Sequence, residues 1–134
     1  MADNVALVEK AYEAFGRGDV ETVLGLFSEN IEWYEAENSP FWPGRAFHGP
    51  QEIVEGVFAR LGAETKDFRI TISRTLGCGE TVLVQGRYSG SWAANGTSFD
   101  LQMAHIWDFE GGKAVRWQQC TDTLGWARAT GDVK

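Results

Sequence analysis

The sequence predicts a single α+β domain, with its helices and strands segregated along the chain. The chain has 134 residues, and no repeat, low-complexity segment or long linker divides it, so we expect one domain over residues 1–134. Helical periodicity dominates the N-terminal part, and from Asp67 onward the period is two. Helices followed by a long antiparallel meander are typical of the α+β class rather than of alternating βαβ units.

Three helices are expected before residue 67. Apolar residues recur at helical spacing over residues 5–15, and two glycines end that run. Asp19 is a suitable N-cap for a second, short helix, and Gly49-Pro50 opens a third because Pro suits the first helical position. Between the second and third helices, a short strand places three residues on one face, namely Ile31, Trp33 and Glu35.

Four strands are expected near residues 68–74, 81–92, 97–110 and 113–122. Asn95-Gly96 and Gly111-Gly112 predict type I′ hairpins, which need positive φ at both central residues. Turns of even length place His105 opposite Gly86, where the missing side chain leaves room for a ligand. The same register, continued into the last strand, places Gln118 opposite His105, unless a bulged loop reverses the two faces of that strand.

Composition and charge narrow the possible partners. Six Trp and eight Phe suggest a core or cavity walled by rings, while a net charge of −7 argues against a nucleic-acid partner. We find neither a signal peptide nor a membrane-spanning stretch, so we expect a cytoplasmic protein without a membrane partner. Cys78 and Cys120 lack metal-site spacing, so we expect free thiols, no metal and no cofactor.

Three residues are candidates for chemistry. His105 interrupts an apolar strand face, although it could equally be a buried His paired with Gln118 or with a backbone carbonyl. Glu35 ends an apolar face, where desolvation would raise its pKa and suit a general base, unless it points to solvent. Asp122 ends the last strand on the predicted face of His105, or else caps the turn that follows.

Four segments resemble the nuclear transport factor 2-like superfamily, specifically SnoaL-like polyketide cyclases and ketosteroid isomerase-like proteins. These segments are Ala14-Phe15-Gly16-Arg17-Gly18-Asp19-Val20, Phe27-Ser28-Glu29-Asn30-Ile31-Glu32-Trp33, Phe47-His48-Gly49-Pro50-Gln51-Glu52-Ile53 and Phe109-Glu110-Gly111-Gly112-Lys113-Ala114-Val115. The resemblance covers nearly the whole chain. It implies a cone-shaped, curved antiparallel or mixed sheet wrapped around an apolar pocket, with three N-terminal helices.

The resemblance also implies roles for individual residues. Glu35 falls where the isomerase has its catalytic Asp, and His105 falls where it has a second acidic hydrogen-bond donor. The isomerase's Tyr donor falls on Ala11, one residue before Tyr12, which counts against steroid isomerisation itself. Asp122 corresponds to the Asp of SnoaL-like cyclases, although the expected aromatic neighbour is missing.

We therefore expect cofactor-independent isomerisation or aldol-type cyclisation of a small apolar carbonyl compound, with Glu35 as general base and His105 as proton donor or enolate stabiliser. The expected substrate-binding residues are Trp33, Trp42, Phe58, Tyr88, Met103, Trp107 and Gln118. One alternative is a non-catalytic binder of a small hydrophobic ligand. A weaker one is epoxide hydrolysis, for which Arg116 and Asp122 would supply part of an Asp–Arg–Asp network.

Two further expectations concern surfaces. Phe41 and Trp42 lie in a proline-stiffened loop, and we expect them to cover the mouth of the pocket near Glu35. In the predicted register, Ile106 and Trp117 are outward-facing neighbours on the sheet. Such an apolar patch at the centre of an exposed face predicts a homodimer packed sheet to sheet.

Overall fold

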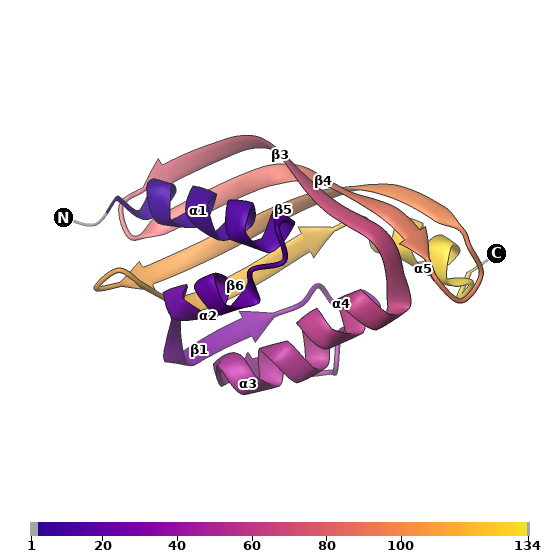
Figure 1. Cartoon of the computed structure of the whole chain (residues 1–134), viewed down its shortest axis with the longest axis horizontal. Helices are drawn as coiled ribbons and strands as arrows, with labels where there is room; N and C mark the ends of the chain where they lie inside the picture. Colours follow the sequence, from indigo (N-terminus) through magenta and orange to yellow (C-terminus); the bar gives the residue numbers. More distant parts are fainter. Residues whose placement is uncertain (1–2, 134) are drawn as a thin grey trace.

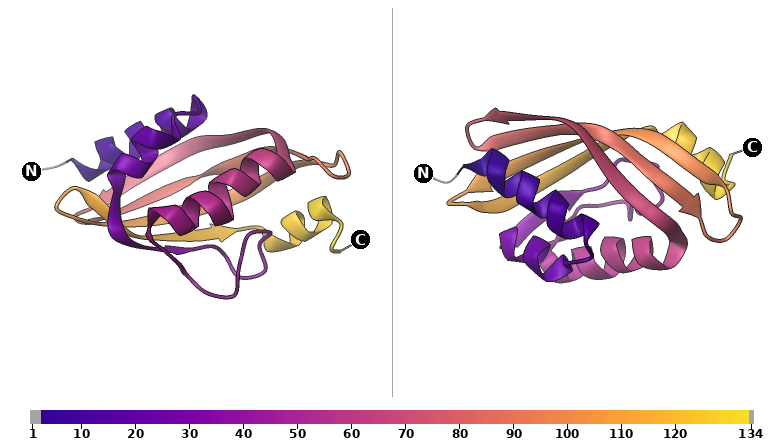
Figure 2. Two further views of the ribbon diagram at one scale, coloured as in Figure 1. Left: turned by 60° about the horizontal axis from the view of Figure 1, so that its bottom comes forward. Right: turned by 45° about the horizontal axis from the view of Figure 1, so that its top comes forward.

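The computed structural model describes residues 3–133 and confirms the α+β class. Six strands form one curved sheet, and the N-terminal helices pack along its concave side (Figures 1 and 2). None of the helices in this part of the chain is long and apolar enough to cross a membrane.

Two helices precede the first strand, and Asp19 caps the second of them. Helix α1 spans Asn4–Gly16, and α2 spans Val20–Leu26. The Asp19 side chain accepts a hydrogen bond from the backbone N–H of Thr22 at 3.1 Å, which confirms its expected N-cap role.

The third helix is continuous but contains one π-helical turn. It runs through α3 (Gly49–Ile53), the π-helical segment η1 (Val54–Phe58) and α4 (Ala59–Glu64), with Pro50 in its first turn as expected. A Cβ atom at Gly56 would lie 2.3 Å from the Phe47 ring, so glycine is what allows that ring to pack against the helix.

The strands are β1 (Phe27–Tyr34), β2 (Phe47–His48), β3 (Thr65–Cys78), β4 (Thr81–Trp92), β5 (Ser98–Glu110) and β6 (Lys113–Thr121). Their order in the sheet is β2-β1-β6-β5-β4-β3, and β1 pairs with β6 in parallel while the other neighbours are antiparallel. The sheet is therefore mixed. A further helix, α5 (Thr123–Thr130), lies where only a turn was expected.

Glycines in β4 allow the sheet to bend around the helices. Gly86 and Gly90 lie beside the two irregularities in the pairing of β3 with β4. A Cβ atom at Gly86 would lie 2.2 Å from the Thr71 carbonyl oxygen. The expectation that Gly86 leaves room for a ligand beside His105 was therefore wrong, because β3 occupies that space and Gly86 pairs with Met103.

The two hairpins differ from their predictions in different ways. The β4–β5 loop has positive φ at Gly96 but not at Asn95, so it is not the expected type I′ turn, and the register moves by two residues. The β5–β6 turn does have positive φ at both Gly111 and Gly112, as predicted. However, the pairing shifts by one residue just beyond it, at Val115.

This one-residue shift inverts the expected faces of β6. Trp117 and Gln119 point into the molecule, and Gln118 lies opposite Ile106 instead of His105. Trp117 is buried, so its expected place on an outer apolar patch was wrong. Ile106 does lie outward, beside the exposed Leu83 on β4.

Candidate functional site

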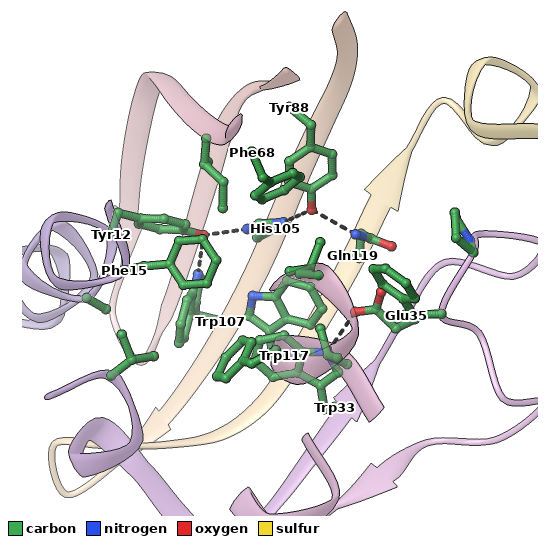
Figure 3. Close-up of a pocket in the computed structure, with 18 of the residues that line it drawn as sticks. Tyr12, Phe15, Trp33, Glu35, Phe68, Tyr88, His105, Trp107, Trp117 and Gln119 are labelled. Carbon is green, nitrogen blue, oxygen red and sulfur yellow. Dashed lines mark hydrogen bonds between the residues drawn. The ribbon is translucent and has the colours of Figure 1, made fainter. Parts of the chain in front are cut away.

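A ring-walled cavity lies between the concave side of the sheet and the helices (Figure 3). Its volume is about 60 Å³, which holds only a few non-hydrogen atoms. Five of the residues expected in the pocket line it, namely Trp33, Phe58, Tyr88, His105 and Trp107. No Lys or Arg within residues 3–133 contributes to its wall.

The remaining predicted pocket residues lie elsewhere. Met103 is buried in the core but does not line the cavity. Trp42 and Gln118 line a shallower groove next to it, which shares Glu35 and Gln119 with the cavity. The Pro-aromatic loop is thus divided, because Phe41 lines the cavity itself while Trp42 covers the neighbouring groove.

Glu35 is a buried carboxylate in an apolar wall. It follows β1 directly and lies on the same face as Trp33, whose indole N–H donates to its Oε2 at 2.7 Å. Burial raises its pKa from 4.5 to about 7, and the Trp33 hydrogen bond opposes this shift only in part. Near neutral pH the carboxyl group therefore exists in both protonation states, as a general base requires.

His105 lies between two tyrosine hydroxyl groups. Its Nδ1 is hydrogen-bonded to Tyr12 and its Nε2 to Tyr88, each at 2.5 Å (Figure 3). Burial lowers the pKa of the imidazole from 6.5 to about 3, so the ring is neutral at physiological pH. Both ring nitrogens are occupied by tyrosines and are therefore not free to contact a ligand.

Each tyrosine hydroxyl also accepts a hydrogen bond from a residue other than His105. The Trp107 indole N–H donates to Tyr12 at 3.0 Å, and the Gln119 side-chain N–H donates to Tyr88 at 2.7 Å. The backbone N–H of Ala36 donates to Gln119 Oε1 at 3.1 Å, which fixes the orientation of the Gln119 amide. Burial raises the pKa of both phenols, so both remain protonated.

Two indole N–H groups in the cavity wall have no hydrogen-bond partner among residues 3–133. They belong to Trp117 and Trp126, and both nitrogens are buried. Trp117 is held by stacking on Trp33, with ring centroids 3.6 Å apart. Buried donors are normally paired, so these two groups are available to an acceptor on a bound ligand.

Asp122 does not belong to the cavity. Its exposed side chain caps α5 by accepting from the Gly125 backbone N–H at 2.9 Å, and it lines neither the cavity nor the groove. Its catalytic assignment was therefore wrong, because the cap that was its alternative role is the one it takes. Arg116 lies on the outer face over the Tyr34 ring, so it cannot join an Asp–Arg–Asp network inside the pocket.

Sequence reasoning missed Tyr12, Trp117 and Gln119. The family resemblance placed the Tyr donor on Ala11, yet Tyr12 itself reaches the cavity from α1. Trp117 and Gln119 were missed because the bulge at Val115 reverses the faces of β6. The adjacent pair Gln118-Gln119 was a signal, because neighbouring strand residues point to opposite faces and one of the two glutamines must therefore face the core.

Comparisons with known proteins agree with this fold. An NTF2-like protein from Burkholderia thailandensis E264 is 34% identical with a TM-score of 0.91, over 96% of this chain and 98% of that one. An NTF2-like protein of unknown function from Burkholderia pseudomallei K96243 is 28% identical with a TM-score of 0.87, over 97% and 98% of the two chains. A putative polyketide cyclase from Silicibacter sp. TM1040 is 14% identical with a TM-score of 0.81, over 94% and 93%.

Searches by sequence add a family but no individual relative. A comparison with curated proteins found no match. The family model of the SnoaL-like domain matches residues 8–117, which include β1 and most of the cavity wall. The chain therefore belongs to the SnoaL-like domain family and has the nuclear transport factor 2-like fold.

Proposed function

We propose that the protein is a cofactor-independent enzyme that moves a proton next to the carbonyl group of a small, mostly apolar substrate. The observation that carries this proposal is the placement of Glu35, with a pKa of about 7, in the same apolar cavity as the tyrosine hydroxyls bound to His105. A base of this pKa can accept a proton from carbon at neutral pH, provided that the resulting enolate oxygen is stabilised.

In this reaction Glu35 takes the proton from the carbon beside the carbonyl, and the C–H electron pair forms the enolate. The Tyr88 hydroxyl donates a hydrogen bond to the carbonyl oxygen as negative charge develops there. In an isomerisation, the Glu35 carboxyl group returns the proton to a different carbon. In an aldol cyclisation, the enolate carbon forms a bond to a second carbonyl carbon, and the resulting alkoxide takes the proton.

His105 has a different role in this proposal from the one expected from sequence. A neutral imidazole with both nitrogens hydrogen-bonded to tyrosines is poorly suited to give a proton to the substrate directly. It acts as a positioning residue for Tyr12 and Tyr88, and Tyr88 makes the contact with substrate.

The fold of a putative polyketide cyclase is shared at 14% identity, and this supports cyclisation only as one chemistry that the fold accommodates. The cavity volume of about 60 Å³ limits the size of the substrate. Only the reacting end of a larger substrate fits without movement of ring side chains, and the groove beside Glu35 and Gln119 is the adjacent space for the remainder.

The direct test is deuterium exchange. The protein is incubated in D₂O with small β-diketones and β,γ-unsaturated ketones, and loss of the acidic C–H signal is followed by NMR. We expect faster exchange than in buffer, rising with pH up to about 7, since the ionised form of Glu35 is the base. Glu35→Gln should reduce the rate by about 10²–10⁴-fold, whereas Glu29→Gln, at an exposed carboxylate of β1 that lines neither the cavity nor the groove, should not.

The competing function is non-catalytic binding of a small hydrophobic ligand, favoured by the small cavity and its aromatic wall. A binder would retain its ligand in the Glu35→Gln variant and would accelerate no exchange at any pH. If no substrate in the panel exchanges faster with the wild-type protein than with Glu35→Gln, the enzymatic proposal fails and binding takes its place.

Homodimerisation is a separate proposal and now rests on Ile106 and Leu83, which lie next to each other on the outer face of the sheet. No helix covers this face in the part of the chain that the structure describes (Figure 2). Light scattering at micromolar concentration should give twice the monomer mass, and Ile106→Glu should reduce it to the monomer mass. A monomeric wild-type protein would contradict the proposal.

A further inference from the structure

The hydrogen atoms of the Tyr12–His105–Tyr88 triad can be counted from its hydrogen-bond partners. Both tyrosine oxygens already accept one hydrogen bond from outside the triad, Tyr12 from an indole N–H and Tyr88 from an amide N–H. The orientation of the amide is fixed by the backbone N–H of Ala36, so its N–H₂ group must face Tyr88. The hydroxyl hydrogens are therefore left to the imidazole or to the cavity.

A neutral imidazole carries one N–H and one unprotonated nitrogen. If the hydrogen is on Nε2, His105 donates to Tyr88, and Tyr12 must donate its hydroxyl hydrogen to Nδ1. If the hydrogen is on Nδ1, His105 donates to Tyr12, and Tyr88 must donate to Nε2. Each tautomer thus uses one hydroxyl hydrogen and leaves the other without a partner inside the triad.

From this count we infer that the triad always presents one free tyrosine O–H to the cavity, and that the His105 tautomer decides whether Tyr88 or Tyr12 presents it. Both tyrosines line the cavity, so either free hydrogen can meet a ligand there. The ligand atom that this arrangement selects is an uncharged acceptor, such as a ketone oxygen. The inference deepens the proposed function, because it specifies which group would hold the carbonyl oxygen.

The Nε2–H tautomer is the productive one for the proposed reaction. It leaves the hydroxyl hydrogen free on Tyr88, whose pKa is raised first by burial and then by the charge of Glu35. Exchange between the tautomers moves three hydrogens: the Tyr12 hydroxyl hydrogen passes to Nδ1, the Nε2 hydrogen passes to Tyr88, and the hydrogen that was free on Tyr88 passes to Tyr12 through a water molecule in the cavity. No net charge is created in this exchange, which suits a site without a cation in its wall.

The tautomer can be measured without any substrate. The chain has only two histidines, His48 and His105, so ¹⁵N-labelled imidazole signals are assigned with one variant, His48→Gln. A protonated and an unprotonated ring nitrogen have distinct ¹⁵N shifts, and the carbon-bound ring hydrogens identify which is which. We expect one nitrogen of His105 to carry hydrogen and the other not, between pH 6 and pH 8.

Two variants should place the imidazole hydrogen of His105 on opposite ring nitrogens. Tyr12→Phe removes the partner of Nδ1, so the hydrogen should reside on Nε2, where Tyr88 still accepts it. Tyr88→Phe removes the partner of Nε2, so the hydrogen should reside on Nδ1 and bond to Tyr12. Circular dichroism and tryptophan fluorescence establish that each variant is folded before its spectrum is compared.

Opposite tautomers in the two variants support the inference. The same protonated nitrogen in both variants would overturn it, as would protonation of both nitrogens in the wild-type protein at neutral pH. Should a variant fail to fold, the wild-type spectrum alone still decides, because a doubly protonated ring would free both hydroxyl hydrogens at once. None of these outcomes depends on turnover, so the triad can be confirmed even if the deuterium-exchange test fails.

Discussion

Glu35 and His105 face one cavity and are buried almost equally, with 3% and 2% of their surface exposed, yet they are bonded very differently. Among residues 3–133, the Glu35 carboxylate accepts one hydrogen bond, from Trp33, and Glu35 lines both the cavity and the groove. His105 has a partner at each ring nitrogen. The two groups are equally buried, but the two hydrogen bonds of His105 hold the imidazole in place, whereas the carboxylate of Glu35 remains available for chemistry.

Their pKa values show the same contrast in electrostatic terms. Burial disfavours the charged form of both groups, so it raises the pKa of Glu35 to about 7 and lowers that of His105 to about 3. Near neutral pH, Glu35 can change its charge and His105 cannot. A residue that titrates in the working range is the better candidate for the catalytic base, and the other is better suited to orient its neighbours.

After the loss of the Glu35 carboxylate, the largest expected effect tests the tyrosine side of this contrast. Tyr88→Phe removes the proposed hydrogen-bond donor to the substrate oxygen while keeping the ring. We expect the deuterium-exchange rate to fall by about 10²–10³-fold, as is usual for loss of one donor to a developing oxyanion. Ser73→Ala is the control for loss of a hydroxyl group, since the exposed Ser73 hydroxyl donates to the Gln85 carbonyl and lines neither the cavity nor the groove. An exchange rate for Tyr88→Phe equal to that of Ser73→Ala would remove Tyr88 from the mechanism.

The fold and the site differed in how far sequence could predict them. Helix caps and strand periodicity depend on near neighbours, so Asp19 and the faces of β4 and β5 were predicted correctly. The faces of β6 depend on a single extra residue, Val115, and nothing in the local pattern shows that the strand bulges there. Because of that one residue, Gln119 lines the cavity, and Gln118, which was expected there, lines only the neighbouring groove.

The functional site was predicted less completely than the fold, because it depends on contacts between segments that are distant in the sequence. Tyr12 bonds to His105 across 93 residues of sequence, and Gln119 bonds to Tyr88 across 31. Periodicity can assign a residue to a face, as it did for Glu35, but it cannot say which hydroxyl reaches which ring nitrogen. His105 was thus recognised as unusual, while its partners were not.

The next prediction uses stability to compare the two buried groups. Glu35 has a raised pKa in the folded state. Its contribution to the free energy of unfolding is therefore fully present below about pH 4.5 and is lost as the pH rises to about 7. His105 has a lowered pKa, so its contribution is present above about 6.5 and is lost as the pH falls toward 3. Between pH 4.5 and 6.5 the two slopes oppose each other and nearly cancel.

Glu35→Gln removes one of the opposing slopes. The free energy of unfolding of this variant should rise by about 3 kcal/mol between pH 4.5 and 6.5, at 1.36 kcal/mol per pH unit, whereas that of the wild-type protein should stay nearly level. Urea unfolding at several pH values measures both curves. Parallel curves for the two proteins would mean that the Glu35 pKa is not raised, and the contrast with His105 would then disappear.

The smallest expected effect concerns Asp122, the carboxylate that the structure removes from the site. It caps α5, whose Trp126 packs on Phe99 with ring centroids 4.7 Å apart. Asp122→Ala should therefore lower the free energy of unfolding by about 1 kcal/mol, while Asp122→Asn, which also caps helices well, should change it little. Both variants should keep the wild-type exchange rate, because the side chain lines neither the cavity nor the groove. A catalytic Asp122 would show the reverse, with Asp122→Asn nearly as stable as the wild-type protein and yet inactive.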